Sequence, residues 1–210
     1  MNLKLVQDDI ILFQGDSITD VGRNREQSED LGRGYPYMIA SKLAYQYPSM
    51  NLTFYNRGIS GNRVINLQER WDRDCLALKP NWVSIYIGIN DTWRRYDRND
   101  PTSAEQFETG YRDILTRTKE QLQANLIMLE PFVLPHPADR EAWREDLDPK
   151  ITIVRKLARE FNALLVPLDG LFAQASMKAH SSYWAGDGVH PSAAGHALIS
   201  DAWLRAIEKT

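Results

Sequence analysis

The stretch Ile10-Ile11-Leu12-Phe13-Gln14-Gly15-Asp16-Ser17 joins a short apolar run to a small polar turn. An apolar run of this kind is typical of a strand that is buried on both faces of a sheet. Longer segments with the spacing of amphipathic helices separate the apolar runs along the chain. This alternation predicts an α/β protein, a three-layer α/β/α sandwich with a central five-stranded parallel sheet. The five predicted strands are Ile10–Gln14, Leu52–Asn56, Trp82–Ile87, Leu126–Glu130 and Leu164–Leu168.

The predicted helices are recognised by residues that recur on one face. They are represented by Tyr37, Ala40, Ser41 and Ala44, by Ile114, Leu115, Thr118 and Leu122, by Ile151–Phe161, and by Ser192–Ile207. Three long polar connections remain, Asp20–Gly34, Thr92–Pro101 and Val133–Pro149. Because long loops in compact domains are often functional, and ligands bind beyond the carboxyl ends of parallel strands, we expect these loops to form the walls of a site. No repeat or linker divides the chain, so residues 1–210 are expected to form a single domain.

Composition limits the classes of partner. The chain of 210 residues is 43% hydrophobic and 25% charged, which suffices for a full core. With a net charge of -3 and no long basic run, neither nucleic acid nor a membrane is an expected partner. The one cysteine, Cys75, excludes an intramolecular disulfide. The segment Met1–Phe13 contains Asp8 and Asp9 and fits neither a signal peptide nor a membrane span, so we expect a cytoplasmic protein.

Ser17 is the first candidate catalytic residue. Gly15 permits a tight turn after the first predicted strand, and a backbone N–H at a helix start can face an anion. The same turn also fits a simple strand-to-helix connection in which Asp16 and Ser17 are only caps. Taken alone, the motif leaves both interpretations open.

A candidate base for Ser17 lies near the other end of the chain. A serine needs a base to become a useful nucleophile. In Asp187-Gly188-Val189-His190, one tight loop can present an imidazole together with the carboxylate that orients it. The alternative is a polar helix start with a surface histidine, since Pro191 suits the first position of the last helix.

Two further turns supply hydrogen-bond donors. Gly88-Ile89-Asn90-Asp91 follows the third predicted strand, and Gly58-Ile59-Ser60-Gly61-Asn62 follows the second. The Ser17 N–H, the Gly61 N–H and the Asn90 side chain together make the set of donors that a tetrahedral oxyanion requires. Each turn alone is unremarkable, but all four motifs fall at carboxyl ends of predicted strands or at the start of the last helix. That shared context favours the catalytic interpretation.

In their order along the chain, the four motifs resemble those of the GDSL/SGNH hydrolase superfamily, which has a flavodoxin-like fold. Their surroundings look like those of intracellular carbohydrate acetylesterases, especially bacterial acetylxylan esterases, in the stretches Gly15–Asp20, Arg57–Val64, Lys79–Asp97 and Asp187–Gly195. The resemblance implies that Ser17 is the nucleophile, His190 the base and Asp187 its partner. It also implies an oxyanion hole formed by Ser17, Gly61 and Asn90.

Aromatic residues near these motifs are candidates for sugar binding. Trp93 and Tyr96 follow Asn90 closely, and Trp184 precedes Asp187. Each ring can be a platform for a sugar or a hydrophobic wall. Trp143 is expected at a rim or an interface. The remaining tryptophans with helix or strand spacing are expected in the core, namely Trp71, Trp82 and Trp203.

Motifs for other chemistry are absent from the sequence. It contains no G-x-S-x-G, no phosphate-binding glycine motif and no H-E-x-x-H, so neither a cofactor nor a catalytic metal is expected. His136 and His180 are expected to be solvated.

The sequence thus predicts a serine esterase that removes acetyl groups from acetylated sugars or xylo-oligosaccharides through an acetyl-enzyme. One alternative is a lysophospholipase or general short-chain carboxylesterase of the same superfamily, which the polar loops disfavour. The other is a non-catalytic carbohydrate-binding protein, which the full set of catalytic residue types disfavours. A homo-oligomer is left open.

Overall fold

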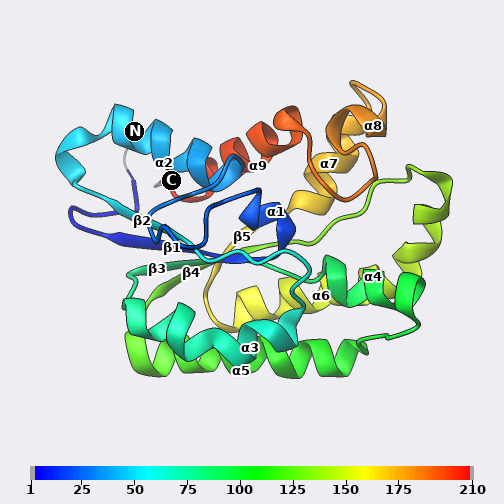
Figure 1. Ribbon diagram of the computed structural model, residues 1–210, viewed down its shortest axis with the longest axis horizontal. Helices are drawn as coiled ribbons and strands as arrows, with labels where there is room; N and C mark the ends of the chain where they lie inside the picture. The colour runs from blue at the N-terminus through cyan, green and yellow to red at the C-terminus, as the bar shows by residue number, and fades with distance from the viewer. Residues whose placement is uncertain (1–2, 209–210) are drawn as a thin grey trace.

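Five parallel strands form the sheet at the centre of the computed structural model, which describes residues 3–208 (Figure 1). Their spatial order is β2-β1-β3-β4-β5, the order of flavodoxin-like folds. The strands are β1 (Ile10–Gly15), β2 (Thr53–Asn56), β3 (Trp82–Tyr86), β4 (Asn125–Leu129) and β5 (Leu164–Val166). The predicted α/β fold is therefore confirmed, and each predicted strand lies within two residues of its observed bounds.

Helices cover both faces of this sheet. In Figure 1, α2 and α9 lie above the sheet with α7 and α8, whereas α3, α5 and α6 lie below it. The helices are α1 (Ser17–Asp20), α2 (Tyr35–Gln46), α3 (Val64–Asp74), α4 (Ile89–Arg98), α5 (Ala104–Leu122), α6 (Arg144–Glu160), α7 (Leu168–Ser176), α8 (Ser181–Trp184) and α9 (Ala193–Ala206). Short 3-10 turns occupy η1 (Pro48–Met50), η2 (Leu76–Leu78) and η3 (Ala138–Trp143). None of the helices in the described part of the chain is long and apolar enough to cross a membrane.

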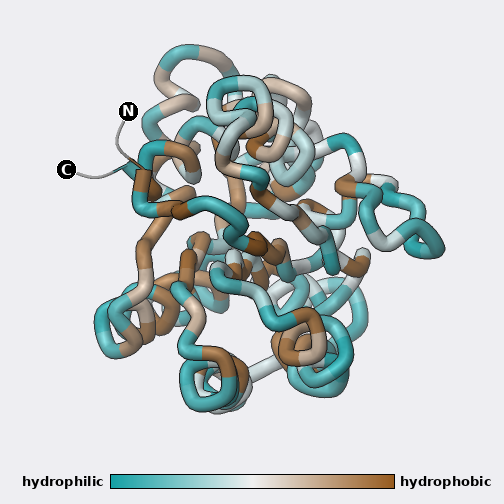
Figure 2. Tube along the Cα trace, turned by 90° about the vertical axis from the view of Figure 1, so that its left-hand side faces the viewer, coloured by the Kyte–Doolittle hydropathy of each residue, from teal (hydrophilic) through white to brown (hydrophobic). Residues whose placement is uncertain are grey.

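Side chains of β1 alternate between two cores. Ile11 and Phe13 join the core under α2 and α9, whereas Leu12 joins the core above α3 and α5. Figure 2 shows the same division, with apolar segments between the layers and hydrophilic residues on the outer turns of the helices. The tryptophans predicted for the core are all buried: Trp71, Trp82 and Trp203.

The predicted buried face of α2 is wrong. The helix buries Tyr35, Ile39 and Leu43, whereas Tyr37 is 55% exposed and Ala44 is exposed. Alanine and an amphipathic tyrosine imitate an apolar stripe in the sequence, but Ile39 and Leu43 remove more apolar area from water. Of the predicted face, Tyr37, Ala40, Ser41 and Ala44, the structure buries Ala40.

Two of the predicted long loops are largely helical. α4 occupies most of Thr92–Pro101, and η3 with the start of α6 occupies much of Val133–Pro149. The segment Asp20–Gly34 has turns and bends, as expected of a loop. α4 escaped prediction because its buried residues are confined to its first turn, so its sequence lacks a long apolar stripe.

The strand order decides where a site can form. In this order the chain reverses its winding direction between β1 and β3, and ligands of such sheets bind outside the carboxyl ends at that point. Ser17 lies two residues beyond the end of β1, and Asn90 lies in the first turn of α4, the helix that follows β3. Both residues therefore lie at the switch point of the sheet.

Candidate active site

Ser17 is the first residue of α1 and is held there by a tight turn. The Asp16 carboxylate caps the helix by accepting a hydrogen bond from the Ile18 N–H at 3.0 Å. A side chain on Gly15 would place its Cβ 2.5 Å from the carbonyl oxygen of Tyr86. Only glycine therefore fits at the end of β1, where this strand lies against β3. This local geometry fixes the Ser17 hydroxyl at the carboxyl end of the sheet.

Ser17, His190 and Asp187 form a continuous hydrogen-bonded chain. The Ser17 Oγ lies 2.9 Å from His190 Nε2, and His190 Nδ1 lies 2.6 Å from Asp187 Oδ2. Both distances are those of a nucleophile, a base and the group that orients the base. The structure thus brings together, from opposite ends of the sequence, the residues that were predicted to act as a unit.

The loop that carries Asp187 and His190 is shaped by its own backbone. Asp187 Oδ1 accepts hydrogen bonds from the N–H groups of Val189 and His190, at 2.9 and 2.7 Å. Gly188 has a φ of 81°, and its Cβ would lie 2.2 Å from the carbonyl oxygen of His136. Glycine is therefore required at this point, where the loop presses against the segment after β4.

These contacts shift the ionisation of both side chains. The hydrogen bond that His190 donates to Asp187 raises the pKa of His190 above its ordinary value, against the opposing effect of partial burial. Burial opposes ionisation of Asp187, but its hydrogen bonds from His190 and Val189 hold the pKa of the carboxyl well below its usual range. Asp187 therefore stays ionised, and it favours the imidazolium form of His190.

A second carboxyl group, Asp16, lies beneath the site. It is 1% exposed, and burial raises its pKa to about 7, although the Ile18 N–H and nearby His190 favour the ionised form. With a pKa of about 7, the Asp16 carboxyl titrates in the neutral range, and its charge, when it is ionised, favours the imidazolium form of His190.

Asn90 and Gly61 lie on neighbouring turns. Asn90 is 3% exposed, and its Nδ2 donates one hydrogen bond to the Asn62 carbonyl oxygen at 3.1 Å. An amide NH₂ has two N–H bonds, so one remains for a ligand. Gly61 has a φ of 83°, and Asp20 holds its turn by accepting the Ser60 N–H at 3.0 Å. The hydrogen bond to Asn62 places the remaining Asn90 N–H beside the turn that carries Gly61.

An aromatic cluster adjoins His190. The Trp93 ring centroid lies 5.7 Å from that of His190 and 5.2 Å from that of Trp143. Tyr96 stacks on Trp143 at 5.2 Å, and its hydroxyl donates to the Ala142 carbonyl oxygen. These rings line a surface cavity of about 450 Å³, whose lining residues are Trp93, Tyr96, Asp97, Asp139, Arg140, Ala142 and Trp143.

Other aromatic predictions had different outcomes. Trp143 is 2% exposed, so the expectation of a rim or interface residue is wrong: it packs beneath Trp93 and Tyr96. Trp184 is half-buried, and its indole N–H donates to the Ala175 carbonyl oxygen on α7 at 3.1 Å. Contact of Trp184 with substrate stays a prediction. His136 and His180 lie edge to face, 5.1 Å apart.

Arg140 is a residue of the site region that sequence reasoning missed. Its guanidinium lies over the Trp143 and Trp93 rings, at 4.1 and 5.4 Å, and its Nε donates to the Asp187 carbonyl oxygen at 3.1 Å. It therefore links the aromatic cavity to the Asp187 loop. No local pattern in the sequence marks this arginine among the many others. Within residues 3–208, no group of three or more potential ligand side chains is placed to hold a metal ion.

Comparison with known proteins gives matches along nearly the whole chain. Residues 13–198 match the GDSL-like lipase/acylhydrolase family. The chain is 36% identical to an acetylxylan esterase of Geobacillus stearothermophilus, over 98% of this chain and 96% of that protein. A crystal structure of that acetylxylan esterase superposes with a TM-score of 0.89 at 35% identity, covering 99% of this chain and 98% of the other. The structure of a GDSL-like protein of Parabacteroides merdae superposes with a TM-score of 0.93 at 39% identity, covering 99% of both chains.

Proposed function

The chain belongs to the GDSL-like lipase/acylhydrolase family and is a serine hydrolase that acts on esters; from that premise we propose that it removes acetyl groups from acetylated sugars or xylo-oligosaccharides. The proposal assigns the nucleophile to Ser17, the base to His190 and the orienting carboxylate to Asp187. It assigns the oxyanion hole to the N–H groups of Ser17 and Gly61 and to the side chain of Asn90.

In the first half of the proposed reaction, the Ser17 Oγ attacks the acetyl carbonyl carbon while His190 Nε2 takes its proton. The carbonyl oxygen becomes an oxyanion that accepts the three hydrogen bonds. When the C–O bond to the sugar breaks, the protonated His190 gives its proton to the leaving sugar oxygen. In the second half, a water molecule is deprotonated by His190 and attacks the acetyl-enzyme, which releases acetate and restores the Ser17 hydroxyl.

The observation that carries the proposed substrate class is the aromatic cavity beside His190. Trp93 offers an apolar ring next to the base, while Asp97, Asp139 and Arg140 at the cavity wall can hydrogen-bond hydroxyl groups. This mixture suits a sugar, whose rings have apolar faces and polar edges, better than a long acyl chain. The similarity to an acetylxylan esterase supports the same class.

A product assay tests this substrate class. Acetate release is measured from acetylated xylobiose, xylotriose and xylotetraose, and compared with p-nitrophenyl esters of two, four, eight and twelve carbons. We expect the highest kcat/KM among the p-nitrophenyl esters for acetate, and a higher value again for the acetylated oligosaccharides. A preference for the eight- or twelve-carbon esters would instead assign the protein to the lipid-directed esterases.

A matched pair of variants tests whether the sugar binds at the aromatic cavity. Tyr96→Ala should raise KM for acetylated oligosaccharides more than for p-nitrophenyl acetate, because Tyr96 is 37% exposed at the cavity. Tyr45→Ala is the control, because Tyr45 is 86% exposed on α2. Equal effects of Tyr96→Ala on both substrates would contradict sugar binding at this cavity.

A further inference from the structure

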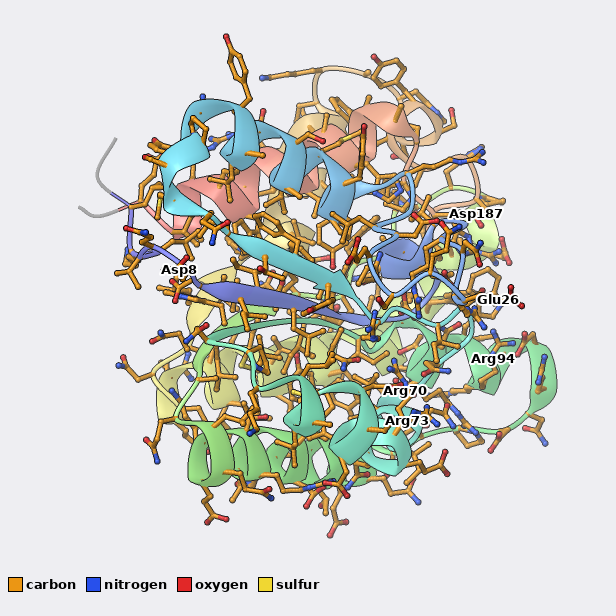
Figure 3. The ribbon with its side chains drawn as sticks, turned by 60° about the vertical axis from the view of Figure 1, so that its left-hand side comes forward. Asp8, Glu26, Arg70, Arg73, Arg94 and Asp187 are labelled. Carbon is orange, nitrogen blue, oxygen red and sulfur yellow. The ribbon has the colours of Figure 1, made fainter. Side chains whose placement is uncertain are left out.

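Arg94 lies one helical turn beyond Asn90 on α4 and contacts it directly. One guanidinium nitrogen donates to Asn90 Oδ1 at 3.1 Å, and another nitrogen of the same group is paired with Asp97. The Arg94 side chain is 16% exposed. Figure 3 shows Arg94 and Asp187 at the same end of the sheet, with Asp8 at the opposite end.

These contacts leave the Asn90 amide one favourable orientation. Its oxygen accepts from Arg94, and its nitrogen donates to the Asn62 carbonyl oxygen at 3.1 Å. If the amide turned by half a rotation, its oxygen would face the Asn62 carbonyl oxygen and its NH₂ would face the guanidinium. Both contacts would then be repulsive, because acceptor would meet acceptor and donor would meet donor.

We propose that Arg94, held by Asp97, is a positioning residue that orients and polarises the Asn90 amide for the oxyanion. This inference rests on the proposed function of Asn90. A charge-assisted hydrogen bond to the amide oxygen draws electron density from the NH₂ group, so its remaining N–H becomes a stronger donor. The stronger hydrogen bond matters most when negative charge develops on the substrate oxygen. Losing Arg94 should therefore lower kcat and leave KM nearly unchanged.

A competing role for Arg94 is direct substrate contact. Its guanidinium carbon lies 5.7 Å from the Trp93 ring centroid, near the aromatic cavity. A substrate contact would act independently of Asn90, whereas a positioning residue acts only through it. A double-mutant cycle between the two residues separates these roles.

The experiment measures kcat and KM for p-nitrophenyl acetate in the wild type, Arg94→Met, Asn90→Ala and the double variant. We expect Arg94→Met to lower kcat about ten- to a hundredfold, as for a lost hydrogen bond to a charged group, with little change in KM. In the Asn90→Ala background, Arg94→Met should change kcat less than about twofold. Arg94→Lys keeps the charge and should recover part of the lost kcat.

Two further variants keep the test decisive. Arg98→Met makes the same substitution at an exposed position of the same helix and should leave kcat unchanged. Asp97→Asn frees the guanidinium without removing it, and should lower kcat in the wild type but not in Asn90→Ala. It serves as the test if thermal melting finds Arg94→Met unfolded.

The outcomes distinguish this inference from the function on which it rests. If Asn90→Ala leaves kcat unchanged, the oxyanion role of Asn90 fails, and the positioning role falls with it. If Asn90→Ala lowers kcat but the effect of Arg94→Met is additive, or appears only in KM, Arg94 does not act through Asn90. In that case the positioning role alone is overturned.

Discussion

The Ser17 hydroxyl owes its expected reactivity to its neighbours, since a serine without a base is a weak nucleophile. Ser17→Ala removes one hydroxyl and should lower kcat on p-nitrophenyl acetate by about 10⁴-fold or more, as removal of a triad member does elsewhere. The fold should persist, because Ser17 is only half-buried. Steady-state kinetics with a melting curve checks both points. Ser41→Ala, at an exposed position of α2, is the control. Near-normal turnover of Ser17→Ala would show that Ser17 is not the nucleophile and would contradict the proposed mechanism.

Asn90 is expected to act only after charge has moved onto the substrate oxygen. Asn90→Ala should therefore lower kcat by about 10²- to 10³-fold and leave KM nearly unchanged. Initial rates over a range of p-nitrophenyl acetate concentrations separate the two constants. A rise in KM with normal kcat would make Asn90 a substrate-binding residue.

The ionisation of His190 should set the acidic limb of the activity profile. His190 must be neutral to accept the Ser17 proton, and its hydrogen bond with Asp187 raises its pKa above the ordinary value of 6.5. The value of kcat/KM should therefore rise with pH through the raised pKa and level off in mildly alkaline solution. Rates measured from pH 5 to pH 9 in buffers of constant ionic strength test this expectation.

Removing the negative charge beside His190 should move this limb. In Asp187→Asn, the group that most strongly opposes deprotonation of the imidazole loses its charge, so the pKa of His190 should fall and any remaining limb should shift to lower pH. The rate should also fall by about 10⁴-fold, as for the same change in a serine protease, because the ring can adopt the wrong tautomer. An unchanged rate and limb would reduce the triad to a dyad of Ser17 and His190.

At the scale of elements, α1 is held in place by the turn after β2. A Cβ on Gly58 would lie 2.4 Å from the Asp20 nitrogen and 2.8 Å from the Thr19 carbonyl carbon, both in the backbone of α1. Gly58→Ala should therefore displace α1, lower stability by about 1–3 kcal/mol and lower kcat. Urea unfolding and kinetics on the same sample measure both effects.

A second glycine provides the matched control for Gly58→Ala. Gly170 lies inside α7, and a Cβ there would meet nothing within 4 Å. Gly170→Ala should raise stability by about 0.5–1 kcal/mol, since alanine is the better helix former, and leave kcat unchanged. If both variants lost kcat equally, packing of α1 against the turn would not explain the effect at Gly58.

Strands were the elements most accessible to prediction. β1, β3 and β4 are buried on both faces along most of their length, so most of their residues are apolar, and the apolar run itself marks each strand. α4 gave no such signal, because polar residues cover it beyond its first turn, and its surface carries ion pairs such as that between Arg94 and Asp97.

Site residues, like the strands and helices, were predictable only where a local pattern in the sequence marks them. Ser17, Asn90 and the pair Asp187 and His190 lie next to strand ends or a helix start, where a short motif and its context can be found in the sequence. Arg140 reaches Asp187 from a segment 47 residues away. Such a contact depends on how the loops pack, so no local pattern reveals it.

At the scale of the whole molecule, buried ionisable groups have opposite effects on how the stability of the fold depends on pH. Burial raises the pKa of Asp16 and Asp91 from 3.8 to about 7, so between these values the folded state holds protons that the unfolded state has released. Both groups therefore stabilise the fold as pH falls, as does His190, whose pKa is raised. Burial lowers the pKa of His196 from 6.5 to about 4, so the proton taken up by the unfolded chain destabilises the fold over that range.

The free energy of unfolding is therefore expected to rise as pH falls from 8 to 5, because Asp16, Asp91 and His190 stabilise the fold as pH falls and only His196 among these four groups destabilises it. Each net proton contributes a slope on the order of 1 kcal/mol per pH unit. Asp91→Asn should flatten this slope, because asparagine can still accept the Val64 N–H but carries no charge. His196→Gln should steepen it. Urea midpoints at pH 5, 6.5 and 8 measure the slopes, with Asp201→Asn, an exposed position on α9, as the control. A wild-type slope that Asp91→Asn leaves unchanged would show that Asp91 does not titrate between the two states, and the buried carboxyls would then not govern how stability depends on pH.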